Sequence, residues 1–275
     1  DGHIYFADTF GATPAEALTP ATTESVVDSA GLGDTTPYPL ADTFMLESRP
    51  GAKTTIFLDF DGGTVSDSAW NERSAGAPIV AGPLNLDGYA AAFSPFELAF
   101  IQTVWQEVAE DFAPFGVNVT TKDPGLEALR RTSEADDTYG IWALITPRPA
   151  AFDTCGCAGI AYMNVFNSVS SSRFYQPAWI FADYDTSTGS IASHEIGHTL
   201  GLSHDGTTSL EYYRGHDHWG PIMGASGGGA VTQWSKGEYL DANRTEDDLA
   251  IIAASGPGFA ADDHGNTAAT ATSLG

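Results

Sequence analysis

The chain has 275 residues, 42% of them hydrophobic, and it carries a formal net charge of −25. This length and apolar content can supply one large domain, or about one and a half, and no run of roughly eighteen apolar residues predicts a membrane span. Nucleic-acid binding needs clustered Lys and Arg to contact phosphates, so it is excluded. The acidic surface fits a secreted or calcium-binding protein, and equally simple solubility through net charge.

The first part of the chain, residues 1–45, is rich in Ala, Thr, Pro and Asp and has weak hydrophobic periodicity. It contains one candidate strand, His3 to Phe6, and one candidate short helix, Glu24 to Ser29. We interpret the segment as an extension wrapped on a domain or as a pro-segment.

A β-branched and aromatic run, residues 54–60, predicts a strand that leads into a turn at 61–64. Its end, Leu58-Asp59-Phe60-Asp61-Gly62, resembles the nucleophile loop of haloacid-dehalogenase-type phosphatases, in which the first Asp attacks phosphate and the second acts as an acid. That loop requires Asp-x-Asp-Gly-Thr, whereas here Gly63 precedes Thr64. A calcium site or a structural turn is therefore the favoured interpretation of Asp59 and Asp61.

A loop over about 62–93 precedes the first long predicted helix. Ser94 is expected as its N-cap, Pro95 as its first residue, and Glu97 as the second half of a capping box. Pro114 ends the helix. Five residues at helical spacing predict one apolar, core-facing side: Leu98, Ile101, Trp105, Val108 and Phe112.

Four further strands are expected before the next helix, at 116–121, 140–145, 159–166 and 178–181, with a short helix at 126–131 after the first of them. The chain's two cysteines, Cys155 and Cys157, are separated by one glycine. A local disulfide in an oxidising compartment is favoured over a metal site, because two thiolates without a nearby third ligand bind zinc poorly.

The stretch 193–205 carries the strongest chemical signal. His194 and His198 lie one helical turn apart on one face, and Glu195 lies near the same rim. Gly201 permits a sharp turn with positive φ that brings His204 back toward the first two rings. Three histidines with one open coordination position are typical of a catalytic zinc site.

The pattern His194-Glu195-x-x-His198-x-x-Gly201-x-x-His204 is followed by Pro221-Ile222-Met223-Gly224, where a Met-turn should stand. The stretch resembles the metzincin clan of zinc endopeptidases. Asp205 and Ile222-Met223 are most similar to the adamalysin (reprolysin) branch. With only two cysteines, the chain resembles secreted bacterial members more than disulfide-rich animal members.

The resemblance implies an α/β (α+β) fold of metzincin type, with a twisted, mostly parallel five-stranded sheet, an antiparallel edge strand and two long helices. Residues 46–261 would be the catalytic domain, with the zinc helix at about 190–201. Residues 202–261 would form a smaller irregular subdomain whose terminal helix is capped by Thr245. Residues 262–275 resemble a linker or the start of a pre-peptidase C-terminal domain. Residues 159–165 would be the edge that pairs with an extended substrate.

The resemblance also implies residue roles. His194, His198 and His204 would hold zinc and Glu195 would act as general base. Met223 would form an apolar floor, Tyr212 or Tyr213 could stabilise an oxyanion or contact substrate, and Asp205 would tie the loop in place. Related pro-segments place a Cys or an Asp on the zinc. Residues 1–45 contain no cysteine, so the candidate latency carboxylate is Asp8.

The function expected from these residues is a secreted, extracellular, monomeric zinc endopeptidase, made as a zymogen and acting on protein or peptide substrates. Structural calcium at Asp59 and Asp61 is a further expectation, and no membrane partner is expected. Two alternatives stay open: a phosphatase that uses Asp59 and Asp61, and a non-catalytic secreted binding module stabilised by zinc. His216 and His218 are interpreted as loop residues.

Overall fold

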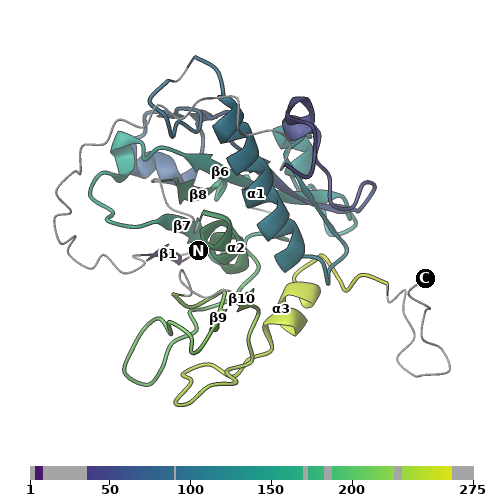
Figure 1. Ribbon diagram of the computed structural model, residues 1–275, viewed down its shortest axis with the longest axis vertical. Coiled ribbons are helices and arrows are strands. Elements are labelled where there is room, and N and C mark those ends of the chain that lie inside the picture. The colour runs from purple at the N-terminus through teal and green to yellow at the C-terminus, as the bar shows by residue number, and fades with distance from the viewer. Residues whose placement is uncertain are drawn as a thin grey trace.

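The structure, a computed structural model, describes residues 4–8, 36–89, 91–169, 173–182, 188–225 and 231–261. A six-stranded sheet with the order β1-β7-β8-β6-β2-β5 forms its centre. Helices α1 and α2 lie across one face of this sheet, and a smaller portion carrying β9, β10 and α3 lies below α2 (Figure 1). The sheet strands are β1 (Tyr5–Asp8), β2 (Thr54–Asp59), β5 (Val117–Thr120), β6 (Tyr139–Thr146), β7 (Gly159–Tyr162) and β8 (Ala178–Phe181).

The sheet is mostly parallel, as predicted. Strands β5, β2, β6 and β8 run parallel, whereas β7 pairs antiparallel with β8. Every residue of β6 is buried, because the strand is covered on both faces and reads as a continuous apolar run. The sheet has six strands rather than five because β1 adds antiparallel to β7, the strand expected at the open edge.

The long helix α1 (Pro95–Asp111) begins as predicted. The backbone N–H of Glu97 donates to the Ser94 hydroxyl over 3.3 Å, and the Ser94 N–H donates to the Glu97 carboxylate over 2.9 Å. The shorter helix α2 (Thr188–Thr199) is buried along its whole described length. One apolar core fills the space between these two helices and the sheet, and a second covers the opposite sheet face.

The segment expected as a plain loop at 62–93 contains regular structure. It forms the hairpin strands β3 (Gly63–Val65) and β4 (Ile79–Ala81), with the 3-10 helix η2 (Ala69–Ser74) between them. Elements this short give almost no hydrophobic periodicity, so the pattern could not predict them. The η2 segment is anchored by Trp70, whose indole N–H donates to the Pro177 carbonyl over 2.9 Å.

Other boundaries also differ from those expected. The helix predicted at 126–131 is the 3-10 helix η3 (Leu126–Leu129), and β7 ends at Tyr162. Two further 3-10 helices are η1 (Leu40–Met45) and η4 (Ala150–Phe152). The Glu24–Ser29 helix and the linker at 262–275 fall outside the described residues, as does His3; the described strand begins at Tyr5.

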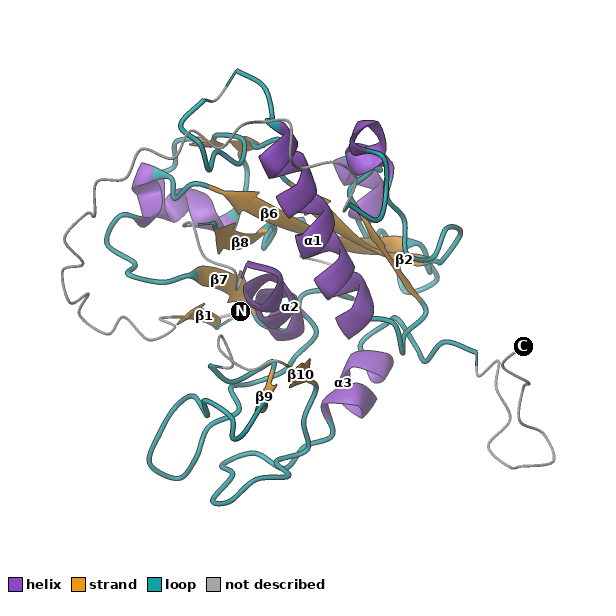
Figure 2. Cartoon of the chain, in the orientation of Figure 1, coloured by secondary structure: helices purple, strands orange, loops and turns teal. Residues whose placement is uncertain are grey.

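The smaller portion contains β9 (Trp219–Pro221), β10 (Val231–Gln233) and α3 (Asp248–Ala254), joined by long loops (Figure 2). The predicted cap of α3 was wrong: the N-cap is Asp247, not Thr245, and its side chain accepts from the Ala250 N–H over 3.2 Å. Three acidic residues follow Thr245, and the second of these, Asp247, has the extended backbone that an N-cap needs. In the described ranges, no helix is long and apolar enough to cross a bilayer.

Candidate metal centre

Two histidines of α2 and one from the following loop converge below the sheet. Gly201 ends the helix with a φ of 103°, the left-handed turn that its position required. The ring nitrogen Nδ1 of His194 lies 2.8 Å from the Ile222 carbonyl oxygen, and Nδ1 of His198 lies 2.8 Å from that of Leu202. A carbonyl only accepts, so each Nδ1 carries the proton and each Nε2 presents a lone pair.

These lone pairs face one another in a buried space. Nε2 of His204 lies 3.1 Å from Nε2 of His198, and with Asp8 the three rings form a group whose ligand atoms all lie within 4.8 Å. Burial lowers the pKa of His198 to about 4, which favours the neutral imidazole that ligates metals. The ring nitrogens and the Asp8 carboxylate all present lone pairs to the same space, and a cation there could bind them together. The residues therefore fit a metal ion.

Asp8 closes the group from the end of β1. Its Oδ1 lies 2.6 Å from His204 Nε2 and 3.4 Å from His194 Nε2, and its Oδ2 lies 3.3 Å from His198 Nε2. The strand register pairs Asp8 with Gly159, and the Ala158 N–H donates to the Asp8 carbonyl over 2.6 Å.

Glu195 points its carboxyl at the start of β7. It is fully buried, and neither carboxyl oxygen has a hydrogen-bond partner among the described residues. A Cβ on Gly159 would lie 2.2 Å from Glu195 Oε1, so only glycine leaves room for this carboxyl. Burial and the neighbouring Asp8 charge raise the pKa of Glu195 well above its usual value.

Met223 lies beneath the helix that carries the first two histidines. It is fully buried, and its sulfur would lie 2.6 Å from a Cβ built on Gly197. The preceding residue, Ile222, supplies the carbonyl that orients His194. The turn at 221–224 thus contacts both the packing surface of α2 and one of its imidazoles.

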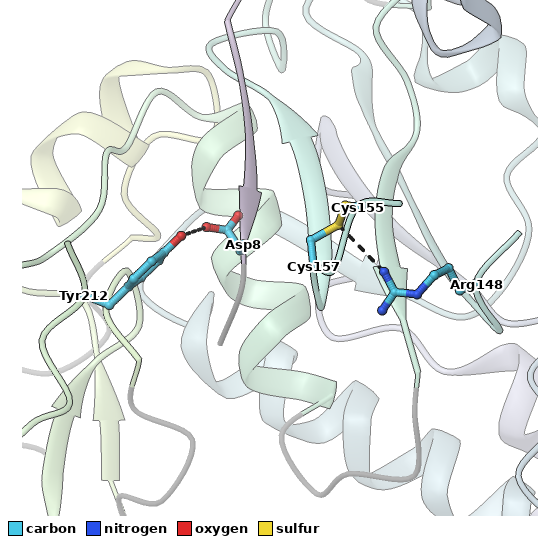
Figure 3. The surroundings of a disulfide bond; sticks show 5 residues. All are labelled: Asp8, Arg148, Cys155, Cys157 and Tyr212. Atoms are coloured by element: carbon cyan, nitrogen blue, oxygen red, sulfur yellow. Dashed lines mark hydrogen bonds between the residues drawn. A yellow bond between two sulfur atoms is a disulfide. The ribbon is translucent and has the colours of Figure 1, made fainter. Parts of the chain in front are cut away.

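The two tyrosines considered from the sequence have different surroundings. The Tyr212 hydroxyl donates to Asp8 Oδ1 over 2.9 Å (Figure 3). Its ring centroid lies 4.4 Å from that of His204. Tyr213 instead contacts His216 Nδ1 through its hydroxyl at 2.9 Å. The structure therefore places Tyr212 at the metal centre and both Tyr213 and His216 outside it. His218 is exposed.

Asp205 joins two loops of the smaller portion. Its N–H donates to the Met223 carbonyl over 2.8 Å, and its carbonyl accepts from the Tyr213 N–H over 2.7 Å. Its side chain is buried, and burial followed by the charges of Glu246 and Glu238 raises its pKa to about 7. These two bonds come from the Asp205 backbone, so the role of its carboxylate in fixing the loop stays a prediction.

The structure adds contacts that the sequence did not indicate. Glu211 Oε1 lies 3.2 Å from His204 Nδ1, and the Phe6 ring stacks on His198 with centroids 4.9 Å apart. Neither residue belongs to the histidine motif. A weak signal existed for Phe6 alone, because it lies two residues before Asp8 in a candidate strand and so shares its face.

The remaining candidates lie away from this centre. Cys155 and Cys157 form a disulfide just before β7, and the Arg148 guanidinium lies 3.9 Å from the Cys157 sulfur (Figure 3). The Asp59 carboxylate accepts from the Trp142 indole over 2.8 Å and from the Asp61 N–H over 2.9 Å. Among described residues, the only cation-capable group of three or more His, Cys, Asp or Glu is the Asp8–histidine group.

A mostly parallel sheet, with two of three convergent histidines on a buried helix beside it, is compatible with a metzincin-type metallopeptidase. Residues 115–205 match the family model described as Metallo-peptidase family M12B Reprolysin-like. The match covers β5 to α2 and includes Glu195 and all three histidines, so the predicted reprolysin resemblance is confirmed over these residues. No curated protein matches the chain.

Proposed function

We propose that this chain is a secreted, zinc-dependent endopeptidase that hydrolyses peptide bonds in protein substrates. The observation that carries the proposal is the convergence of three Nε2 lone pairs beside the buried Glu195 carboxyl, at the end of the sheet edge. His194, His198 and His204 would hold the ion. When bound, zinc supplies Lewis-acid activation of water and of a carbonyl oxygen.

Strand β7 would orient the substrate. Its edge now hydrogen-bonds with β1: the Met163 N–H donates to the Ile4 carbonyl over 2.9 Å, and the Ala158 N–H donates to that of Asp8. An extended peptide in place of β1 would accept from the same donors. This pairing would bring a peptide bond next to the Glu195 carboxyl, since Asp8 pairs with Gly159.

Glu195 would act as the general base. It would take a proton from the attacking water and pass it to the leaving amine nitrogen. The Tyr212 hydroxyl, which now donates to Asp8 Oδ1, would donate to the oxyanion that develops there. Burial and the Asp8 carboxylate raise the pKa of Tyr212, so the phenol stays protonated and can donate.

The contacts of Asp8 support a latent form. Its carboxylate faces all three imidazoles and β1 covers the edge that a substrate needs, so the described arrangement would exclude substrate until this strand leaves. The disulfide and the charge of −25 support an extracellular setting. Structural calcium at Asp59 and Asp61 stays a prediction.

The experiment is a Glu195→Gln substitution in the zinc-loaded full chain carrying Asp8→Ala, which removes the proposed latency carboxylate, assayed on a generic unfolded protein substrate. We expect hydrolysis to fall by about 10²- to 10⁴-fold, with zinc stoichiometry and circular dichroism unchanged. Glu110→Gln, the same change at an exposed site on α1, should retain activity. In the same assay Asp8→Ala should raise the rate of the full chain, and a chelator should abolish it.

Two results would refute the proposal. The first is full hydrolysis by the Glu195→Gln chain, which would remove the general base from the mechanism. The second is a zinc-loaded Asp8→Ala chain that is folded yet hydrolyses no peptide bond.

A further inference from the structure

Strand β1 presents different side chains to the two faces of the sheet. Residues two apart in a strand share a face, and accordingly Phe6 and Asp8 both contact the histidines. Tyr5 points to the opposite face and lies against three side chains of other segments. Its ring centroid is 5.5 Å from that of Tyr162 and 5.8 Å from that of Trp70, and the Arg73 guanidinium carbon lies 5.3 Å from its centre.

This aromatic platform, formed by Trp70, Tyr162 and Arg73, is held by contacts that do not involve Tyr5. The Trp70 and Tyr162 rings pack with centroids 4.4 Å apart. The Trp70 indole is hydrogen-bonded to Pro177, and Tyr162 also packs on Tyr175 at 4.6 Å. Tyr5 itself is 44% exposed. The platform is therefore built into the folded domain, and Tyr5 rests on it from outside.

The position of the platform along the edge matters because β1 has the direction and register that an added peptide would have. Tyr5 pairs with Tyr162, and Asp8 pairs with Gly159 beside the general-base candidate. The platform is thus three residues upstream of the strand position nearest the metal centre. A peptide that replaces β1 would place one side chain on it.

We propose that Trp70, Tyr162 and Arg73 form a substrate subsite that selects an aromatic side chain three residues before the one that takes the place of Asp8. This inference rests on the proposed endopeptidase function and names the substrate class for it. The selected residue is either the third or the fourth before the cleaved bond. Whichever of these positions it is, it should be the same in all favoured substrates.

The chemistry of the platform favours a ring over an aliphatic chain. Two ring walls at interplanar angles of 57° and 79° to Tyr5 offer tilted and edge contacts. A guanidinium over the ring face adds a cation–π attraction that an aliphatic side chain cannot make. Because the occupant stays partly exposed, the hydroxyl of a tyrosine or the larger ring of a tryptophan can extend into water.

The test uses the zinc-loaded full chain carrying Asp8→Ala, with cleavage sites mapped by mass spectrometry on a peptide library. Phe, Tyr and Trp should be enriched at one fixed position, the third or fourth before the cleaved bond. In paired peptides, Tyr at that position should exceed Ala in kcat/KM by about 2- to 12-fold. Arg73→Gln should reduce this ratio by about 2- to 5-fold. Arg244→Gln, the same change in the smaller portion, should leave it unchanged.

Further variants separate selection from general damage. Tyr162→Leu should also reduce the Tyr/Ala ratio, and Tyr5→Ala should increase cleavage of the Tyr peptide more than that of the Ala peptide because it vacates the platform. Efficient cleavage without aromatic enrichment, or a ratio unchanged in both Arg73→Gln and Tyr162→Leu, would overturn the subsite and leave the endopeptidase standing. Absence of any cleavage by the folded chain would overturn the endopeptidase and the subsite together.

Discussion

The two parts of the molecule that meet at the metal centre hold it by different means. The upper part, residues 36–199, consists of a buried sheet and two helices, and it carries His194 and His198 on α2. The lower part, residues 200–261, is mostly loop, yet the Ile222 and Leu202 carbonyls in it fix how both rings are turned. Apolar packing thus sets where the helix lies, and irregular backbone sets the orientation of its ligands.

The interiors of the two parts differ in the same way. The core of the upper part is almost entirely apolar, with residues such as Ile141 fully buried in the central strand. The lower part buries two carboxyl groups that interact with each other: Asp205 and Asp248 are each about 3% exposed. Burial, followed by the Asp205 charge, raises the pKa of Asp248 to about 8. Burial also raises the pKa of Asp111, in the upper part, to about 7, so the stability of both parts should depend on pH. In the lower part the repulsion between Asp205 and Asp248 adds to the effect of burial.

The largest effect is expected from the upper part. Ile141→Ala should lower the free energy of unfolding by about 2–5 kcal/mol, because it removes buried methylene groups and leaves a cavity in the central strand. Denaturant unfolding at pH 4.5 and pH 8.5 should give the same loss at both. Val80→Ala, a truncation at a site 70% exposed, should change stability by less than about 0.5 kcal/mol. A loss that varies strongly with pH would show that the cavity perturbs titrating groups rather than apolar packing alone.

An intermediate effect is expected from Asp248→Asn. The folded chain keeps a proton on Asp248 that the unfolded chain releases, so wild-type stability should fall as pH rises from about 4 to about 8. Asparagine does not titrate, so the variant should lack this dependence of stability on pH. Its side-chain oxygen can still accept the hydrogen bond from the Ser235 N–H. Relative to wild type, the variant should gain about 1–3 kcal/mol between pH 4 and pH 8.5.

Chemical denaturation across that pH range measures the gain directly. Asp217→Asn is the same change at an exposed position of the lower part. Its free energy of unfolding should vary with pH as that of the wild type does. If Asp248→Asn also runs parallel, the burial of this carboxyl does not govern the stability of the lower part.

The smallest effects are expected from removing the N-cap side chain of one helix in each part. Ser94→Ala and Asp247→Ala each remove the side chain that caps a helix and should each cost about 1 kcal/mol. The first should lower global stability, because α1 packs on the main core. The second should mainly speed hydrogen exchange within α3, a short helix of 7 residues. Equal acceleration of exchange in both helices by either variant would show that the two parts unfold as one.

The sequence predicted the features that regular periodicity or a fixed motif determines. The α1 capping box and the turn at Gly201 follow from local rules, and the structure has them. The mostly parallel sheet was implied by the family resemblance, and the structure has it as well. The convergence of the histidines was predictable from local rules, since one helical turn and one glycine bend fix three of the imidazoles within twelve residues.

The features that were missed depend on contacts between segments far apart in the chain. Tyr5 meets Trp70 and Tyr162 only because β1 adds to the edge of β7, and no local pattern records that pairing. The hairpin β3–β4 is made of three-residue strands, too short for alternation to show. The sequence pattern predicted Gly159 only as a strand residue. It did not show that the Glu195 carboxyl, thirty-six positions later, needs the space that a side chain at Gly159 would fill.

The addition of β1 to β7 has a consequence for handling the protein. The far side of the sheet is already protected, because Glu47 bridges to Thr120 on β5 and the Ser48 hydroxyl accepts from the Val119 N–H. With β1 in place, the ladder of β7 is filled, and the sheet ends in β1, a strand of only 4 residues. If that strand departs, as the proposed latent form requires, β7 becomes an open template for self-association, so the segment proposed to block catalysis would also limit aggregation of the protein.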